Sequence, residues 1–169
     1  SNLSKNKKIK VMNYIFDYKN SKKIQKKIGK VDYVIANNVV NHSNNPDDFV
    51  KGVNNILNDD GCFIFEQPYW LEMMKTSRID QIYHEHITYF TIKFSKWLLE
   101  RHSMYLYDFE ISPYHGGSLR LIAKKNFKLS NKNQKKIISG INQEVKFGLF
   151  NKSTYQNINT KLQNKKKIL

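Results

Sequence analysis

The sequence predicts an α/β fold: a parallel sheet that is extended by a β-hairpin and followed by helices. Two apolar stretches, 30–37 and 62–68, flank a segment in which apolar residues recur at helical spacing. Two later stretches, 104–112 and 118–124, alternate apolar and polar residues on either side of a Gly-Gly turn. Beyond them the chain is rich in lysine and keeps a helical pattern. These three observations set the predicted order of the elements.

The first two strands and the helix between them form the clearest unit. The strand KVDYVIAN is short and rich in β-branched residues, as strands buried in parallel sheets are. In the helix that follows, Asn45 can cap the first turn and Gly61 can close the last. The second strand, CFIFEQP, stops at Pro68. Strand, helix and strand with short links predict a right-handed βαβ unit, whose ligands bind at the carboxyl ends of the strands.

The later elements follow from caps and alternation. The stretch PYWLEMMK predicts one or two helical turns, and 91–102 predicts an amphipathic helix that Thr91 can cap. The alternating strands 104–112 and 118–124 can pair as a hairpin across PYHGG. Two helices are expected from there to the end. The segment DQIYHEHITYF, between the two earlier helices, has no clear period.

Composition limits the class of protein. Hydrophobic residues make up 40% of the 169 residues and aromatic residues 13%, which is enough for a buried core. No stretch approaches the ~20 uninterrupted apolar residues of a membrane span, so no membrane partner is expected. Cys62 is the single cysteine, which excludes an internal disulfide framework and a zinc site built on several cysteines. A reducing cytoplasm is the expected compartment.

The net charge of +15 is unevenly distributed. Residues 31–123 hold seven Lys or Arg against twelve Asp or Glu, whereas the two flanks together hold twenty-two against two. The basic excess therefore lies outside the segment that carries the histidines. Aromatic residues are not interleaved with the basic runs, as a stacking groove for nucleic acid would require. We read the lysines as solvated surface and expect no specific nucleic-acid partner.

The string IYHEHITYF gathers the densest set of proton-handling side chains. If the segment is extended, His84 and His86 share one face, and Tyr83 and Glu85 share the other. The spacing does not match a zinc-protease helix, which needs histidines at i and i+4, and a His-x-His zinc site would need further ligands from elsewhere. We therefore expect no metal. Proton transfer suits such a set, and hydrogen-bonded structural histidines are the alternative.

Two further strings could contact a ligand. In HGGSLR, at 115–120, adjacent glycines let backbone N–H groups approach an anion, and Ser118 and Arg120 add donors. A plain hairpin turn is the alternative, since Gly-Gly is a turn signal. In ANNVVNH, at 36–42, His42 lies just past the end of a strand, although a lone histidine is more often structural.

Taken together, these strings resemble one enzyme family. ANNVVNHSNNPDDFVKG, GCFIFEQPYW, DQIYHEHITYF and ISPYHGGSLRLI, in this order, are similar to the sugar C-methyltransferases over roughly 10–125. Those enzymes use S-adenosylmethionine to methylate a carbon of a nucleotide-linked 4-keto-6-deoxy sugar. The resemblance implies a partial Rossmann-like class I methyltransferase sheet with an added β-hairpin and a helical C-terminal extension. It divides the chain into half of a cofactor-binding domain (1–75), a catalytic strip with a substrate-binding hairpin (76–125) and a helical connector (126–169).

The resemblance also implies roles for individual residues. Removal of the proton at C3 needs a base, and the enolate oxygen that forms needs a hydrogen-bond donor. Tyr83 and His42 are the candidates for these two roles, in either order. Glu85 and His86 would orient and tune them. The remaining site residues would contact S-adenosylmethionine (Asn37, Asn38) or the nucleotide sugar (Glu66, His115, Ser118, Arg120), with the last as a diphosphate contact.

Three parts of that family are missing from these 169 residues: a zinc module built on cysteines, the Gly-rich loop that holds the methionine end of the cofactor, and a C-terminal domain. We therefore expect a piece of a longer enzyme. Two alternatives stay open. One is a degenerate, non-catalytic binding module, and the other is a methyltransferase with another acceptor, because many substrates share this cofactor-binding half.

Overall fold

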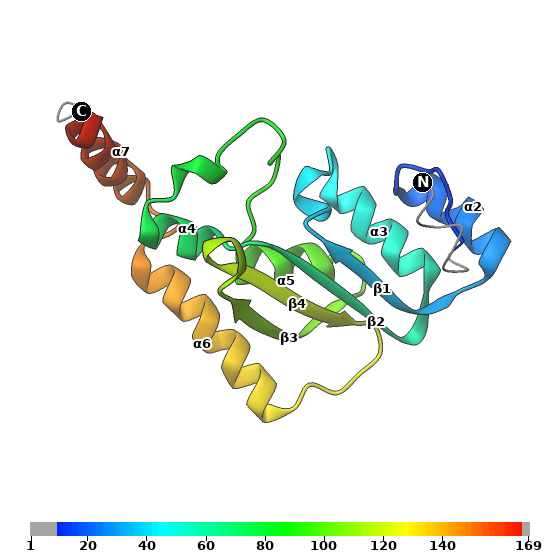
Figure 1. Ribbon diagram of the computed structural model, residues 1–169. Helices are drawn as coiled ribbons and strands as arrows, with labels where there is room; N and C mark the ends of the chain where they lie inside the picture. Colours follow the sequence, from blue (N-terminus) through cyan, green and yellow to red (C-terminus); the bar gives the residue numbers. More distant parts are fainter. Residues whose placement is uncertain (1–9, 167–169) are drawn as a thin grey trace.

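The computed structural model describes residues 10–166 (Figure 1). At its centre lies a four-stranded sheet of order β1-β2-β4-β3. The strands are β1 (Val31–Asn37), β2 (Leu57–Pro68), β3 (Tyr105–Ser112) and β4 (Ser118–Lys124). The helices are α2 (Tyr18–Ile28), α3 (Pro46–Ile56), α4 (Trp70–Thr76), α5 (Ile92–Glu100), α6 (Asn131–Phe147) and α7 (Lys152–Lys166), with 3-10 turns η1 (Val40–His42), η2 (Ile79–Gln81) and η3 (Tyr114–Gly116).

The predicted βαβ unit is confirmed. Strands β1 and β2 are parallel and α3 connects them. The side chain of Asn45 caps α3 by accepting the N–H of Asp48 at 3.1 Å. The prediction that Gly61 closes this helix is wrong, because α3 ends at Ile56 and Gly61 lies inside β2. The residues just before Cys62 form an irregularity in the pairing of β2 with β1, and this irregularity lengthens the strand beyond its predicted start.

The predicted hairpin is also confirmed, and it continues the sheet. Strands β3 and β4 are antiparallel to each other, and β4 is antiparallel to β2. The hairpin therefore adds two strands directly to the parallel pair. As a result, the ends of β1 and β2 and the turn of the hairpin lie along one edge of a single mixed sheet (Figure 1).

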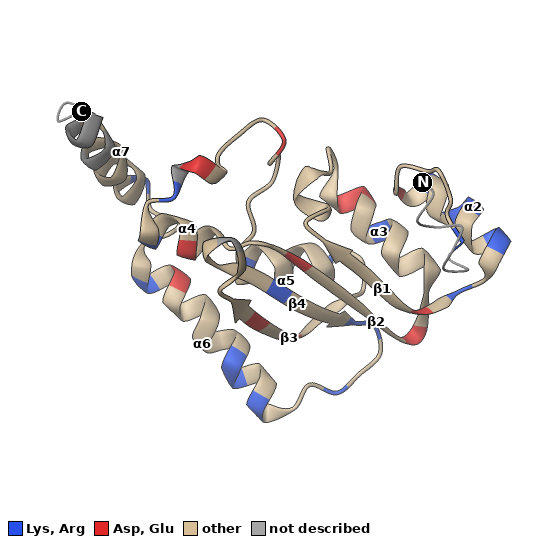
Figure 2. Cartoon of the chain, viewed as in Figure 1, with Lys and Arg blue, Asp and Glu red and all other residues tan. Residues whose placement is uncertain are grey.

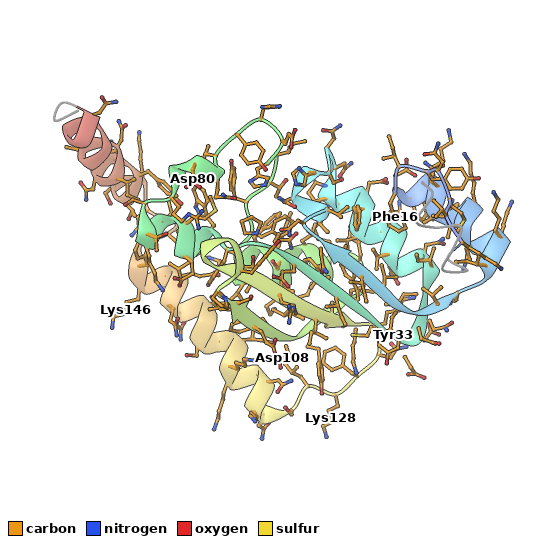
Figure 3. All side chains as sticks on the ribbon, viewed as in Figure 1. Phe16, Tyr33, Asp80, Asp108, Lys128 and Lys146 are labelled. Atoms are coloured by element: carbon orange, nitrogen blue, oxygen red, sulfur yellow. The ribbon has the colours of Figure 1, made fainter. Side chains whose placement is uncertain are left out.

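Helices cover one face of the sheet. Helix α5 contacts β3, α3 contacts β2, and α6 packs against both α5 and β3 (Figure 1). Thr91 caps α5 as predicted, its hydroxyl accepting the N–H of Phe94 at 3.0 Å. The other face is open beside β1, where Tyr33 and Ile35 are 68% and 66% exposed. Tyr33 is labelled in Figure 3. Most of the buried side chains therefore lie between the sheet and these helices.

Helix α2 was not expected from the sequence. It packs on α3, and Asp17 caps it by accepting the N–H of Asn20 at 2.5 Å. Its sequence, YKNSKKIQKKI, has too few apolar residues for a clear helical pattern. Lysines occupy α2 and α6 on the outside of the fold (Figure 2). Among the described residues, no helix combines the length and apolar character needed to cross a membrane.

Candidate active site

The loop after β1 meets the segment between α4 and α5. The backbone carbonyl of Asn41, in η1, accepts the N–H groups of Ile87 at 3.0 Å and Thr88 at 3.2 Å. This pair of bonds brings the next residue, His42, to the histidines of the segment. The imidazole centroids of His42 and His86 are 5.0 Å apart, in an edge-to-face arrangement. Two of the three predicted site strings therefore come together.

A turn, not an extended strip, shapes the string YHEH. The N–H of His86 donates to the carbonyl of Tyr83 at 3.0 Å, which reverses the chain over four residues. The segment is therefore not extended here, and the condition under which His84 and His86 would share a face is not met. The turn instead brings together residues three apart: the Tyr83 hydroxyl lies 2.9 Å from His86 Nε2, and their rings are 4.2 Å apart. His84 and Glu85 are left exposed.

The contacts of His86 define which of its nitrogens carries the proton. Its Nδ1 lies 2.8 Å from the carbonyl oxygen of Gln81, which can only accept a hydrogen bond. In the neutral ring Nδ1 therefore holds the proton, and Nε2 is the acceptor. It follows that the Tyr83 hydroxyl donates to Nε2. This direction makes His86 the group that can receive the phenolic proton.

Burial separates the two members of this pair. His86 is 8% exposed, whereas Tyr83 is 40% exposed. The imidazole is therefore fixed inside the protein, and the phenol faces the solvent side where a substrate can approach. Glu85, predicted together with His86 to orient and tune Tyr83 and His42, makes no hydrogen bond or ion pair within residues 10–166. The carbonyl of Gln81 is the group that orients His86.

The strand ends carry the predicted cofactor residues. Asn37 ends β1 in register with Glu66, and the N–H of Asn38 donates to the Glu66 carbonyl at 2.7 Å. Asn38 has φ of 51°, in the left-handed region, so the chain turns sharply there. A cavity of about 520 Å³ opens beside His42. Its walls include the exposed apolar side chains of Ile15 and Val39.

The predicted substrate residues Glu66 and Arg120 are bonded to each other. They are partners across β2 and β4, and Arg120 Nε donates to Glu66 at 2.8 Å. Glu110, the partner of Arg120 on β3, lies 3.5 Å from the same guanidinium. Glu66 is buried and Arg120 is 44% exposed. The positive charge of Arg120 is thus flanked by two carboxylates before any ligand arrives.

The turn of HGGSLR is closely packed. Gly117 has φ of 126°, and a Cβ there would lie 2.6 Å from Cβ of Glu72. The buried hydroxyl of Ser118 donates to the carbonyl of Tyr114 at 3.1 Å. Ser118 is therefore used inside the turn. The side chain of His115 lies outside the described part of the structure.

Sequence reasoning missed two residues at this end of the sheet. Arg78, which pairs with Asp80 at 3.0 Å, lies over Gly116, so it joins the segment after α4 to the hairpin turn. Glu144, on α6, is fully buried and accepts a hydrogen bond from the Tyr69 hydroxyl at 2.9 Å. Burial raises the pKa of Glu144 above its usual range. A lone arginine and a lone glutamate carry no motif, so no sequence signal could have identified either.

Buried amides add an open polar position to the site. Within the described residues, the side-chain amide of Asn41 has no hydrogen-bond partner although the residue is 2% exposed. A buried, unpaired amide costs free energy, and a bound ligand can supply its partner. Among residues 10–166, no group of three or more His, Cys, Asp or Glu side chains has a metal-binding arrangement.

Known proteins match this chain in part. C-methyltransferase NovU of Streptomyces niveus is 36% identical over 74 residues, which is 44% of this chain and 18% of that protein. The chain thus spans less than a fifth of its curated relative. A putative methyltransferase in complex with the Trm112 activator of Haloferax volcanii has a TM-score of 0.48 at 11% identity, covering 58% of this chain and 55% of that one.

A second structure is magnesium protoporphyrin IX methyltransferase from Synechocystis PCC 6803 with bound SAH. Its TM-score is 0.45 at 14% identity, covering 57% of this chain and 46% of that one. These TM-scores are too low to add to the assignment. The family match is decisive: the "Methyltransferase domain" family matches residues 4–104. That match covers more than half of the 169 residues, and the chain belongs to the methyltransferase-domain family.

Proposed function

We propose that this chain is the central part of an S-adenosylmethionine-dependent C-methyltransferase that acts at C3 of a nucleotide-linked 4-keto-6-deoxy sugar. The observation that carries the proposal is the pair Tyr83–His86, joined at 2.9 Å beside His42 at the carboxyl end of a parallel strand. The partial likeness to a C-methyltransferase supports the same reaction class. A carbon acid needs a base, and this pair is a base with its own proton acceptor.

The direction of the Tyr83–His86 hydrogen bond supports one division of the two roles. Tyr83 passes its phenolic proton to Nε2 of His86 as its oxygen takes the proton from C3 of the sugar. The C3–H bond breaks, and its electron pair forms the C3=C4 double bond of an enolate whose negative charge lies on the C4 oxygen. His86 becomes the imidazolium. His42, on the neighbouring loop, is then the donor to the enolate oxygen. This assignment makes Tyr83 the base, a choice that the sequence left open.

We assign the cavity beside His42 to the cofactor. Exposed apolar side chains such as Ile15 and Val39 offer a surface for the adenine ring, and Asn37 and Asn38 lie at the strand end next to the loop that forms another wall. Asn41, which precedes His42 in the chain, does not line this cavity, but its buried amide is without a hydrogen-bond partner among the described residues. When bound, S-adenosylmethionine supplies the methyl group that C3 takes up. Exclusion of water from this cavity would protect the enolate from reprotonation.

Proton exchange tests the base without the methyl donor. In heavy water, the full-length protein should exchange the C3 proton of a nucleotide-linked 4-keto-6-deoxyglucose, as followed by NMR. Tyr83→Phe keeps the ring but removes the hydroxyl, and we expect exchange to slow by about 100-fold or more. His42→Asn should slow it by a similar factor because the enolate loses its donor.

Tyr105→Phe is the matched control, since it makes the same change at an exposed tyrosine of β3 that has no role in the site and should leave exchange within about twofold. Normal exchange in both Tyr83→Phe and His42→Asn would contradict the proposal. If the wild-type protein transfers a methyl group to another acceptor but exchanges no sugar proton, the acceptor is wrong and the family assignment stands.

A further inference from the structure

The segment that carries Tyr83 and His86 begins and ends at neighbouring positions next to the sheet. It starts after β2 at Tyr69 and ends at the first turn of α5. The two ends are joined at the base, where Trp70 N–H donates to the Phe90 carbonyl at 3.0 Å, and Tyr69 and Phe90 form an isolated parallel bridge. Residues 70–90 are therefore a closed loop whose position depends on how its base is held.

One carboxylate holds both sides of this base. Glu144 of α6 accepts the hydroxyl of Tyr69 at 2.9 Å on one side. On the other it accepts the N–H groups of Ile92 at 2.5 Å and Lys93 at 3.1 Å, the first two residues of α5. These N–H groups lack partners within the helix, and the N-terminus of a helix attracts negative charge. The three bonds together fix α4, α5 and α6 to one another around the loop.

The neighbouring residues strengthen this contact from the same end of α6. Tyr155, on α7, accepts the indole N–H of Trp70 at 3.0 Å, and the Trp70 ring lies 4.6 Å from Tyr89 in the loop. Lys93 Nζ lies 4.6 Å from the centroid of the Phe150 ring. The C-terminal helices therefore contact the loop at its base, far in sequence from the reacting groups.

A glutamate is a demanding choice here. Fully burying a carboxylate costs free energy unless hydrogen bonds compensate. Glutamine could accept from Ile92, but its NH₂ group would then face the N–H of Lys93, donor against donor. The position therefore needs a side chain with two hydrogen-bond acceptors, which a carboxylate provides.

We propose that Glu144 is a positioning residue for the reaction: it ties both ends of the loop 70–90 and thereby sets the approach of Tyr83 and His86 to the substrate. This proposal rests on the proposed function for its kinetic part alone. Displacing a reacting group by about 1 Å costs about 100-fold in rate even when the change is remote. Loss of the hydrogen bonds of Glu144 at the base of the loop would allow such a displacement of Tyr83 and His86.

Three variants of the full-length protein test Glu144. In Glu144→Ala we expect kcat for C3 proton exchange to fall by about 10- to 100-fold with KM within about twofold, and backbone hydrogen exchange over 77–91 to quicken by at least about 10-fold. Glu144→Gln, which keeps the bond to Ile92, should lie between the wild type and Glu144→Ala. Tyr69→Phe removes a single bond and serves if Glu144→Ala does not fold.

The matched control is Ile137→Ala, a buried position on the same helix with no part in these bonds. It should lower the melting temperature and leave both the kcat and the protection of 77–91 close to wild type. Equal effects in Ile137→Ala, or wild-type kcat and protection in Glu144→Ala and Tyr69→Phe, would overturn the proposal. If the wild-type protein exchanges no sugar proton, the proposed function fails, and hydrogen exchange over 77–91 alone decides whether Glu144 ties the loop.

Discussion

The two turns beside the candidate site use their polar side chains in opposite ways. In the turn 83–86, Tyr83 is exposed and donates to a buried histidine whose other nitrogen is already fixed. In the hairpin turn, Ser118 is buried and bonded to its own turn, and Arg120 beyond it is flanked by carboxylates. The first arrangement leaves a reactive hydroxyl with a proton acceptor behind it. The second holds a backbone in place.

This difference separates chemistry from support. A side chain that must move a proton needs an accessible atom and a fixed partner, and Tyr83 has both. A side chain that shapes a turn needs its hydrogen bonds satisfied within the protein, as Ser118 does. Both strings were candidates for function in the sequence, and the structure gives them unequal expected effects when they are mutated.

The largest effect should come from breaking the Tyr83–His86 pair. His86→Gln leaves an oxygen that can accept the tyrosine hydroxyl but cannot take its proton, so we expect a loss of about 100-fold or more in C3 proton exchange. Because the two residues act as a unit, Tyr83→Phe together with His86→Gln should cost little more than either alone. Rates from all four proteins, measured at one pH, check this. Losses that multiply would show that the residues act independently.

Mutation of the hairpin turn should lower the stability of the protein. Gly117→Ala forces a Cβ to within 2.6 Å of Glu72 Cβ at φ of 126°, and we expect the free energy of unfolding to fall by about 3 kcal/mol. The matched control is Gly29→Ala, where φ is 79° and ψ −167° but a Cβ meets nothing within 4 Å, so only the backbone strain of about 1–2 kcal/mol should be lost. Urea unfolding measures both. Equal losses would mean that the hairpin turn and Glu72 can move apart.

The comparison also shows which features the sequence can predict. The βαβ unit, the caps at Asn45 and Thr91 and the hairpin all depend on residues close together in the chain, and the structure has them. Their signals are local: a run of β-branched residues, a capping side chain, an alternation. The prediction that His42 and His86 share one site had no such local signal, since it depended on the family resemblance.

The features that the sequence does not predict have the opposite origin. The string YHEH has no clear period, so the sequence leaves its conformation open. In the structure the chain turns at 83–86, and the carbonyl of Asn41 holds the residues that follow. The sequence could not identify Glu144, because its three hydrogen-bond partners, Tyr69, Ile92 and Lys93, lie more than fifty residues away in the chain. Long-range partners of single polar residues leave no pattern in the sequence around them.

A smaller effect is expected at the pair Glu66–Arg120. Arg120→Met keeps the length of the side chain and leaves the buried Glu66 carboxylate with no partner among its strand neighbours, so about 1–2 kcal/mol of stability should be lost. Glu66→Gln in the same protein should recover part of it. If Arg120 also contacts the diphosphate, KM for the nucleotide sugar rises about tenfold in Arg120→Met. An unchanged KM would restrict Arg120 to a structural role.

The smallest effect should come from Ser118→Ala. The variant removes one neutral hydrogen bond to the carbonyl of Tyr114, which is worth about 1 kcal/mol in the free energy of unfolding. Because the hydroxyl is buried within its own turn, kcat and KM for C3 proton exchange should stay within about twofold of the wild type. Urea unfolding and the exchange assay on the same preparation check both quantities. A large rise in KM with unchanged stability would mean that Ser118 leaves its turn to bind the sugar, and the contrast between the two turns would then fail.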